Sequence, residues 1–171
     1  MDRQVQTPEA MAAIHSPSLA PDALASKTKA LFARLLVPVD FSPGSERVVA
    51  TALSLRRCFG SEVHLFHLAE PSKSEHTTPD AELGAFVVNA ESRLLRFVEG
   101  TFPEYGGRIA VHGSVGFDLV EAITRAARTV RATLVLLAAR PKHSLFRSQI
   151  EKTLRNLDCA VLVEWSSGGL S

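Results

Sequence analysis

The sequence predicts an α/β protein with a five-stranded, parallel, doubly wound sheet of the Rossmann-like type, in three α/β/α layers. Short apolar runs recur along the chain, and segments with helical periodicity separate them. The strongest run, residues 132–139, is continuously apolar, which is typical of a strand covered on both faces. Strands that alternate with helices need crossover connections, which are nearly always right-handed, and the result is a parallel sheet between helices.

The first half of the domain holds two predicted strands and two predicted helices. Residues 35–39 are a short apolar run, and Ser42 and Pro43 then supply an N-cap and a first-turn proline for a helix that Gly60 ends. Residues 63–68 form the second strand, and a polar loop follows to about residue 80. The second helix has apolar residues at helical spacing, namely Leu83, Val87, Ala90, Leu94 and Phe97.

The second half continues the same alternation. Residues 108–112 are a short third strand, and residues 113–116 are a glycine-containing connection. The next helix has its predicted buried face at Leu119, Ile123, Ala127 and Val130. Residues 132–139 form the fourth strand, residues 144–157 the last helix, and the segment from Ala160 to Glu164 the fifth strand.

Length and composition indicate one domain with an appendage. A chain of 171 residues with 46% hydrophobic content can fill one core but is short for two domains. Residues 1–32 are expected to be a disordered tail, because prolines interrupt the segment and no period buries one face. Residues 33–166 are the predicted domain, and residues 167–171 are a flexible C-terminal tail.

Charge and cysteine usage exclude several classes of partner. The net charge of +1 provides no basic footprint for nucleic acid. No apolar run approaches the roughly 20 residues of a membrane span, and the first residues do not resemble a signal peptide. Cys58 and Cys159 lie far apart, which predicts neither a zinc site nor a disulfide framework. His64 and His67 are three apart in a strand, hence on opposite faces, which argues against a shared metal. We therefore expect a cytoplasmic protein that binds neither membrane nor nucleic acid.

Four strings in the right order resemble the universal stress protein family over about residues 34–165. Residues 35–42 (LLVPVDFS) resemble its opening strand and adenine-contacting aspartate, here Asp40. Residues 63–68 resemble its second strand, and Gly113 with the following helix and residues 131–136 resembles the segment that leads into its fourth. Residues 154–163 (LRNLDCAVLV) resemble its closing helix and strand.

The resemblance implies an adenine nucleotide alpha hydrolase-like fold, a role in stress response and a homodimer. Related proteins pair through the last strand, here from Ala160 to Glu164, whose apolar run at a sheet edge would invite pairing. If a nucleotide binds, its contacts are expected at Pro38, Asp40, Leu68, Arg140, Arg147 and Ser148.

The expected phosphate loop departs from the family pattern. ATP-binding members have, after the fourth strand, a glycine, two residues, a second glycine, nine residues, a third glycine, and then Ser or Thr. No glycine occurs here between Gly116 and Gly168, and Arg147 falls where the last glycine would be, although Ser148 keeps the hydroxyl. A side chain in place of glycine blocks positive φ and close backbone approach, and Pro141 removes a further N–H donor. The prediction is therefore that no ATP is bound as a cofactor.

Two alternatives remain open at the expected site. Asp40 could accept a hydrogen bond from an adenine amine, or it could cap the first turn of the helix after the first strand. The cluster Arg140, Lys142, His143 and Arg147 could hold phosphate by charge, or it could be solvated loop charge.

No catalytic motif is recognisable. The sequence has no G-x-S-x-G elbow, no H-E-x-x-H string and no P-loop. We therefore predict a non-catalytic stress-response protein that acts in signalling as a dimeric interaction module with an unknown protein partner. The alternative is a sensor that binds ATP or AMP through the modified basic loop.

Overall fold

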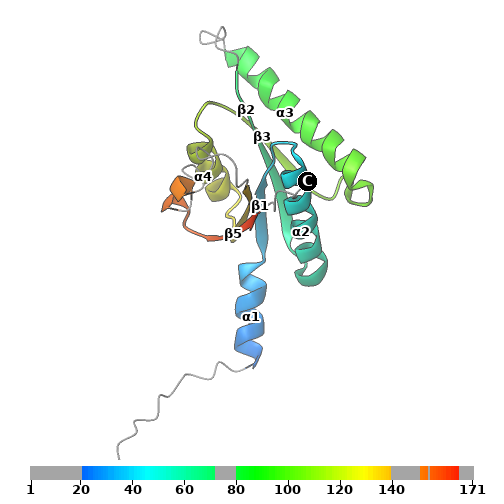
Figure 1. Cartoon of the computed structure of the whole chain (residues 1–171), viewed down its shortest axis with the longest axis vertical. Helices are drawn as coiled ribbons and strands as arrows, with labels where there is room; N and C mark the ends of the chain where they lie inside the picture. Colours follow the sequence, from blue (N-terminus) through cyan, green and yellow to red (C-terminus); the bar gives the residue numbers. More distant parts are fainter. Residues whose placement is uncertain (1–20, 72–79, 140–150, 154, 166–171) are drawn as a thin grey trace, which may run out of the picture.

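The computed structural model describes residues 21–71, 80–139, 151–153 and 155–165. A parallel five-stranded sheet forms its centre, with strand order β3-β2-β1-β4-β5 (Figure 1). The strands are β1 (Arg34–Pro38), β2 (Glu62–Ala69), β3 (Ala110–Val115), β4 (Leu134–Ala139) and β5 (Ala160–Trp165). The predicted α/β class and the parallel sheet are confirmed, and β5 lies at one edge of the sheet as expected.

Helices cover both faces of the sheet: α2 (Pro43–Phe59) and α3 (Asp80–Thr101) pack on one face and α4 (Leu119–Thr129) on the other. A short 3-10 helix, η2 (Pro103–Tyr105), follows α3, and α1 (Pro21–Leu31) extends away from the sheet (Figure 1). Residues 151–153 and 155–156 are also helical, in the region where the last helix is predicted. Within the described ranges, no helix is long and apolar enough to cross a membrane.

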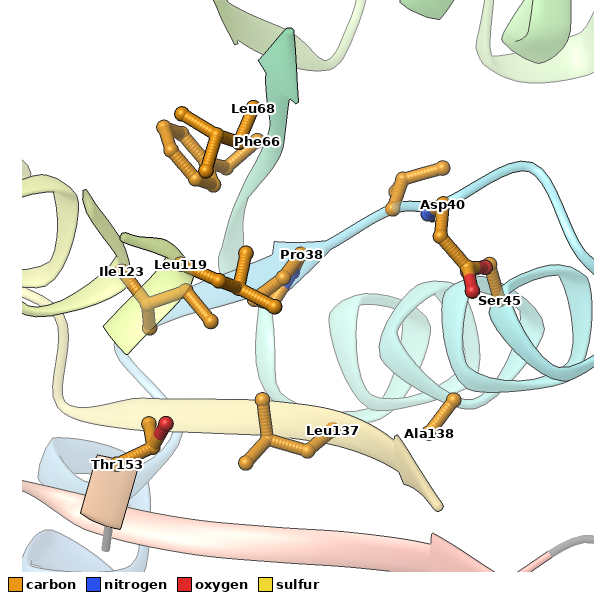
Figure 2. A pocket seen from close by; sticks show the side chains of 11 residues that line it. Pro38, Asp40, Ser45, Phe66, Leu68, Leu119, Ile123, Leu137, Ala138 and Thr153 are labelled. Carbon is orange, nitrogen blue, oxygen red and sulfur yellow. Dashed lines mark hydrogen bonds between the residues drawn. The ribbon is translucent and has the colours of Figure 1, made fainter. Parts of the chain in front are cut away.

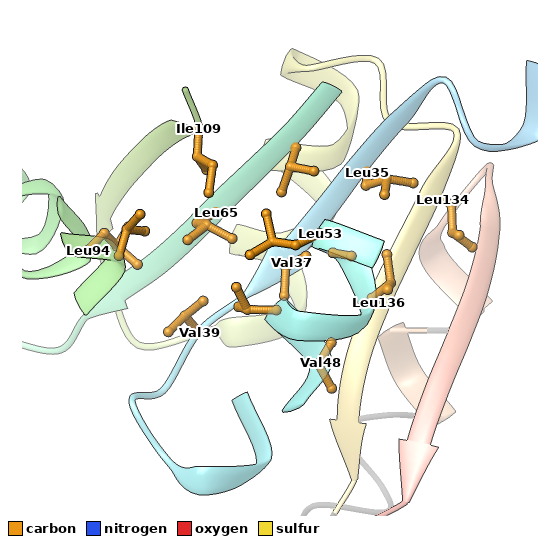
Figure 3. Close-up of a cluster of buried hydrophobic side chains, with 14 residues drawn as sticks. Leu35, Val37, Val39, Val48, Leu53, Leu65, Leu94, Ile109, Leu134 and Leu136 are labelled. Carbon is orange, nitrogen blue, oxygen red and sulfur yellow. The ribbon is translucent and has the colours of Figure 1, made fainter. Parts of the chain in front are cut away.

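Two apolar cores lie on opposite sides of the sheet because successive side chains of a strand point to opposite faces. Leu35 and Val37 of β1 belong to the core under α2 and α3, together with Leu65 and Leu94 (Figure 3). Leu36 points to the other face and packs in the core under α4. All three β1 residues are fully buried, which explains why this strand has a continuous apolar run.

The predicted boundaries of α2 are confirmed in detail. Ser42 is the N-cap, its hydroxyl accepts a hydrogen bond from the Ser45 N–H, and Pro43 occupies the first turn. Gly60 ends the helix in the left-handed region, with φ of 72°. These local signals fix the start of α2 at Pro43, after a short loop that follows β1.

The third strand was predicted at residues 108–112, but β3 spans Ala110–Val115. Residues 113–115, predicted as a connection, therefore belong to the strand. Gly113 suggested a turn, but in the structure it lets α3 pack closely against β3. A Cβ at this position would lie 2.5 Å from the Val87 carbonyl oxygen of α3. The fourth strand also begins later than predicted, because residues 132 and 133 belong to the turn after α4.

Residues 1–32 were predicted to be a disordered tail, but Pro21–Leu31 forms the helix α1. Pro21 is one of the prolines that argue for a tail, but proline is favoured in the first turn of a helix. The residues after it, DALASKTKAL, are mostly good helix formers. Residues 1–20 and 167–171, the rest of the two predicted tails, lie outside the described residues.

Candidate functional site

A pocket lies at the carboxyl ends of β1, β2 and β4. β1 has β2 on one side and β4 on the other, and ligands of open α/β sheets bind where the strand order switches in this way. The pocket contains about 580 Å³ of space, part of it open to solvent. Its walls are mainly apolar side chains of the strand ends and α4, and its polar side chains are Asp40, Ser45 and Thr153 (Figure 2).

The structure brings three of the predicted nucleotide-contacting residues together at this pocket. Pro38 ends β1, Asp40 lies two residues beyond it, and Leu68 comes from the end of β2. The other three, Arg140, Arg147 and Ser148, lie outside the described residues, as does the rest of the predicted basic cluster.

The loop between β1 and α2 sets the position of Asp40. The Val39 N–H donates to the Phe66 carbonyl at 2.8 Å, which continues the pairing with β2 one residue beyond Pro38. Phe41 then turns the chain in the left-handed region, with φ of 59°. A residue with a side chain seldom adopts this conformation. The turn leads directly into the N-cap, Ser42.

Asp40 is bonded to the start of α2. Its Oδ1 accepts hydrogen bonds from the Ser42 N–H at 3.0 Å and from the hydroxyls of Ser42 and Ser45. The Ser45 hydroxyl in turn accepts from the Asp40 N–H at 3.0 Å. Asp40 is thus tied to the helix start in an indirect form: Ser42 is the N-cap and Asp40 orients its hydroxyl. The contact with adenine stays a prediction.

Ring contacts hold Phe41 in its unusual conformation. Its ring makes edge contacts with His67 and Phe97, at centroid distances of 4.5 and 5.7 Å. The Arg93 guanidinium lies 4.4 Å from the ring centre, close enough for a cation–π interaction. These contacts of Phe41 thus stabilise the loop that contains Asp40.

His67 is held in one tautomer by this loop. Its Nδ1 lies 2.8 Å from the Val39 carbonyl oxygen, which can only accept, so Nδ1 carries the proton. Burial lowers the pKa of His67, and the nearby Arg93 charge adds to that effect, while the bond to Val39 and the charge of Asp40 oppose it. His67 is therefore a neutral, structural imidazole at neutral pH.

His64 pairs with a histidine other than His67. Its Nδ1 lies 3.0 Å from the Nε2 of His112, on the neighbouring strand β3. Burial lowers the pKa of His112, and the His64 charge lowers it further, against the opposing effect of Glu91. Among the described residues there is no group of three or more His, Cys, Asp or Glu side chains that could hold a metal ion.

Several residues that line the pocket were not predicted as site residues. Phe66, Ile123 and Leu137 line the pocket, and periodicity placed each of them in an element with a buried face. Their place at the pocket depends on the order of the strands in the sheet and on the residue at which each strand ends. A local sequence pattern gives no information on either. The ring contacts of Phe41, Arg93 and His112 were not predicted either, because each joins residues on different elements.

Comparisons with known proteins agree with this geometry. The model of the universal stress protein family matches residues 31–163. No curated protein matches the chain by sequence. Among the solved structures that share its fold, we describe three, at identities of 18 to 21%.

The first is a protein from the universal stress protein family from Burkholderia pseudomallei, which is 21% identical with a TM-score of 0.56, over 78% of this chain and 96% of that one. The second is a universal stress protein in complex with cAMP, 18% identical with a TM-score of 0.59, over 80% and 98% of the two chains. The third is the universal stress protein from Archaeoglobus fulgidus in complex with dAMP, 18% identical with a TM-score of 0.52, over 78% and 98%.

Proposed function

This chain belongs to the universal stress protein family, and we propose that it acts in the cytoplasm as a non-catalytic, dimeric interaction module of the stress response that does not hold ATP tightly. The bonding of Asp40 is the observation that carries this proposal. The family resemblance assigns this residue to adenine, but its Oδ1 accepts from one backbone N–H and two hydroxyls of α2. A base amine would have to compete with these donors or use the other carboxylate oxygen.

The sequence beyond β4 supports the same proposal. ATP-binding members use glycines there to bring backbone N–H groups to the phosphates. This chain has no glycine between Gly116 and Gly168. Each charge-assisted hydrogen bond to phosphate contributes about 1.5–3 kcal/mol, so the loss of two or three lowers affinity by about a hundredfold or more.

The two edges of the sheet differ, and this difference supports pairing through β5. At the β3 edge, a side chain of α3 reaches the backbone: the Gly113 N–H donates to the Glu91 carboxylate at 3.2 Å. A bonded carboxylate hinders the addition of another strand there. At the β5 edge, Trp165 is 59% exposed and follows an apolar run that another copy could cover.

A second candidate function is nucleotide sensing, and the shape of the pocket favours it. The pocket lies at the switch point, has apolar walls suited to a flat base, and carries a carboxylate at its rim. Two structural neighbours were solved with cAMP and dAMP. In this candidate, the pocket would hold the adenine and the basic residues Arg140 and Arg147 would meet the phosphate.

Calorimetric titration of the full chain distinguishes the two candidates. We expect no binding of Mg-ATP, AMP or cAMP tighter than about 100 μM, a level that corresponds to about 5.5 kcal/mol. We also expect the protein purified from cells to carry no nucleotide.

If a nucleotide does bind, two variants show whether it binds in this pocket. Leu68→Trp fills the pocket, and Leu95→Trp adds the same side chain on the exposed face of α3, where Leu95 is 42% exposed. Micromolar binding that Leu68→Trp or Arg147→Glu abolishes, and that Leu95→Trp leaves intact, would reject the first proposal and favour the sensor.

A further inference from the structure

A second pocket lies at the opposite end of the sheet, beside the last turn of α4. It contains about 680 Å³ of space and is lined by three arginines, Arg34, Arg128 and Arg131. They come from the first residue of β1, the last turn of α4 and the turn after that helix. Among the described residues of the lining, Asp158 is the one carboxylate.

The end of α4 does not need these charges to satisfy its backbone. The Ala132 N–H donates to the Ala127 carbonyl at 2.8 Å, and the Arg131 N–H donates to the Arg128 carbonyl at 3.1 Å. These two bonds are the Schellman arrangement that closes a helix. The Arg34 Nε–H adds a bond to the Arg131 carbonyl at 2.7 Å. The Ala127 and Arg128 carbonyls in the last turn of α4, and the Arg131 carbonyl beyond it, therefore already have donors.

Arg131 occupies a position that usually favours glycine. It is the residue after the C-cap Val130, and its φ is 52°, in the left-handed region. Glycine adopts this conformation without cost, whereas a residue with a side chain is strained there. An arginine at this position therefore loses some backbone stability and adds a positive charge to the pocket.

The other groups around the pocket leave it positively charged. Arg128 lies 3.4 Å from Asp158, but both side chains are largely exposed, so their attraction is weak. The Thr124 hydroxyl donates to the Val120 carbonyl of its own helix. Cys159 also lines the pocket, and burial, with a contribution from Asp158, raises the pKa of its thiol, which stays uncharged at neutral pH.

A rigid frame holds Arg34 next to Arg131. The Thr133 hydroxyl accepts from the Arg34 N–H at 2.9 Å and donates to the Arg34 carbonyl at 3.0 Å. With the Nε–H bond to Arg131, this ties the start of β1 to the turn after α4. A guanidinium has five N–H donors, so Arg34 keeps four beyond the one used in that bond.

We propose that this arginine pocket, formed by Arg34, Arg128 and Arg131, binds a phosphate group, either as inorganic phosphate or as part of a small phosphate monoester. Guanidinium groups recognise phosphate through paired N–H donors and charge. The pocket is separate from the one at the carboxyl ends of the strands. The proposal is therefore independent of whether a nucleotide binds there.

The substitution Arg131→Gly tests the proposal, because it removes the charge and suits the backbone. Without phosphate, we expect the thermal midpoint of this variant to equal or exceed that of the wild type. We expect its apparent Kd for phosphate to rise at least about tenfold, the effect of losing one charge-assisted contact. Arg96→Ala removes one exposed positive charge on α3 and should leave the affinity for phosphate unchanged.

The alkylation rates of the two cysteines report whether phosphate binds in the arginine pocket. Alkylation of Cys159, in the pocket, should slow as inorganic phosphate is added, whereas alkylation of the exposed Cys58 should not change. Chloride at the same ionic strength controls for screening. Comparison with glycerol 3-phosphate shows which source of phosphate binds more tightly. Equal stabilisation of Arg131→Gly and wild type by phosphate, or equal protection of Cys159 by chloride, would overturn the proposal.

Discussion

Gly113 lies on β3 where α3 comes closest to the sheet. A Cβ there would meet the Val87 carbonyl oxygen at 2.5 Å and two side-chain carbons of α3 at 3.1 Å. The carbonyl belongs to the helix backbone and cannot rotate away. Any larger residue must therefore push α3 from the sheet.

We predict that Gly113→Ala lowers the free energy of unfolding by about 1–3 kcal/mol, as overpacking does in other cores. Urea unfolding followed by circular dichroism measures the change. Gly84→Ala is the matched control on α3, because nothing lies within 4 Å of its added Cβ. It should stabilise by about 0.5–1 kcal/mol through helix propensity. A Gly113→Ala variant as stable as the wild type would show that α3 packs less closely than described.

The half-buried imidazoles of His67 and His112 make stability depend on pH. The pKa values of His67 and His112 are lowered from 6.5 in the folded protein, mainly by burial. As pH falls below about 6.5, the unfolded chain takes up protons at these positions before the folded chain does. Their contribution is therefore fully present above pH 6.5 and is lost as pH falls toward the lowered values.

We expect the free energy of unfolding to decrease between pH 7.5 and pH 5.5. The substitutions His67→Gln and His112→Gln should each make this decrease shallower, because each removes one proton-binding difference between the two states. Urea titrations at several pH values measure the slope. A slope that neither substitution changes would mean that other groups cause the dependence.

At the scale of elements, local signals predicted α2 well and β3 poorly. Ser42, Pro43 and Gly60 have roles that depend only on neighbouring residues, so the sequence contains the whole reason for both helix ends. Gly113 is needed because α3, whose contacting residues are more than 20 positions away in the sequence, packs closely against it. The local sequence does not show this contact, so the glycine was interpreted as part of a turn. The start of α1 was missed for a related reason: a proline such as Pro21 breaks or begins a helix according to the residues on its C-terminal side.

The helix α1 adds little to the stability of the domain. Its described side chains are exposed apart from Thr28, and Leu24 is 55% exposed. We predict that deletion of residues 1–26 leaves the thermal midpoint nearly unchanged. Phe32→Ala should lower the free energy of unfolding by about 1–3 kcal/mol, because this ring stacks on Phe59 at 4.6 Å. A clear loss of cooperative unfolding in the deletion would show that the segment packs on the domain.

At the scale of the molecule, the parallel sheet and its layers could be predicted from the alternation of apolar runs, whereas the pockets could not. The carboxyl-end pocket depends on β1 lying between β2 and β4. The arginine pocket depends on a contact between positions 34 and 131, which are 97 residues apart. Sequence periodicity identifies buried faces, but it does not say which strands are neighbours.

We predict that the protein forms a dimer through β5 at micromolar concentration, as sedimentation would measure. Leu162→Lys should give monomer or aggregate. Because Leu162 also packs against the core, the exposed residue Trp165 provides a second variant, Trp165→Lys. Ala110→Lys places the same charge at an exposed position of the other edge strand and should leave the dimer intact. A monomeric wild type would reject this pairing.

The place of β1 in the sheet also determines when the protein can fold during its synthesis. β1 pairs with β2 soon after both emerge from the ribosome, but the partner of Leu35 on its other side is Leu134 of β4, roughly 100 residues further along the chain. At about 5–20 residues per second, this delay amounts to roughly 5–20 s. For that time, one edge of β1, whose Leu35, Leu36 and Val37 are fully buried in the folded protein, stays unpaired. During those seconds this edge can pair with another chain, because an unpaired strand edge is prone to association.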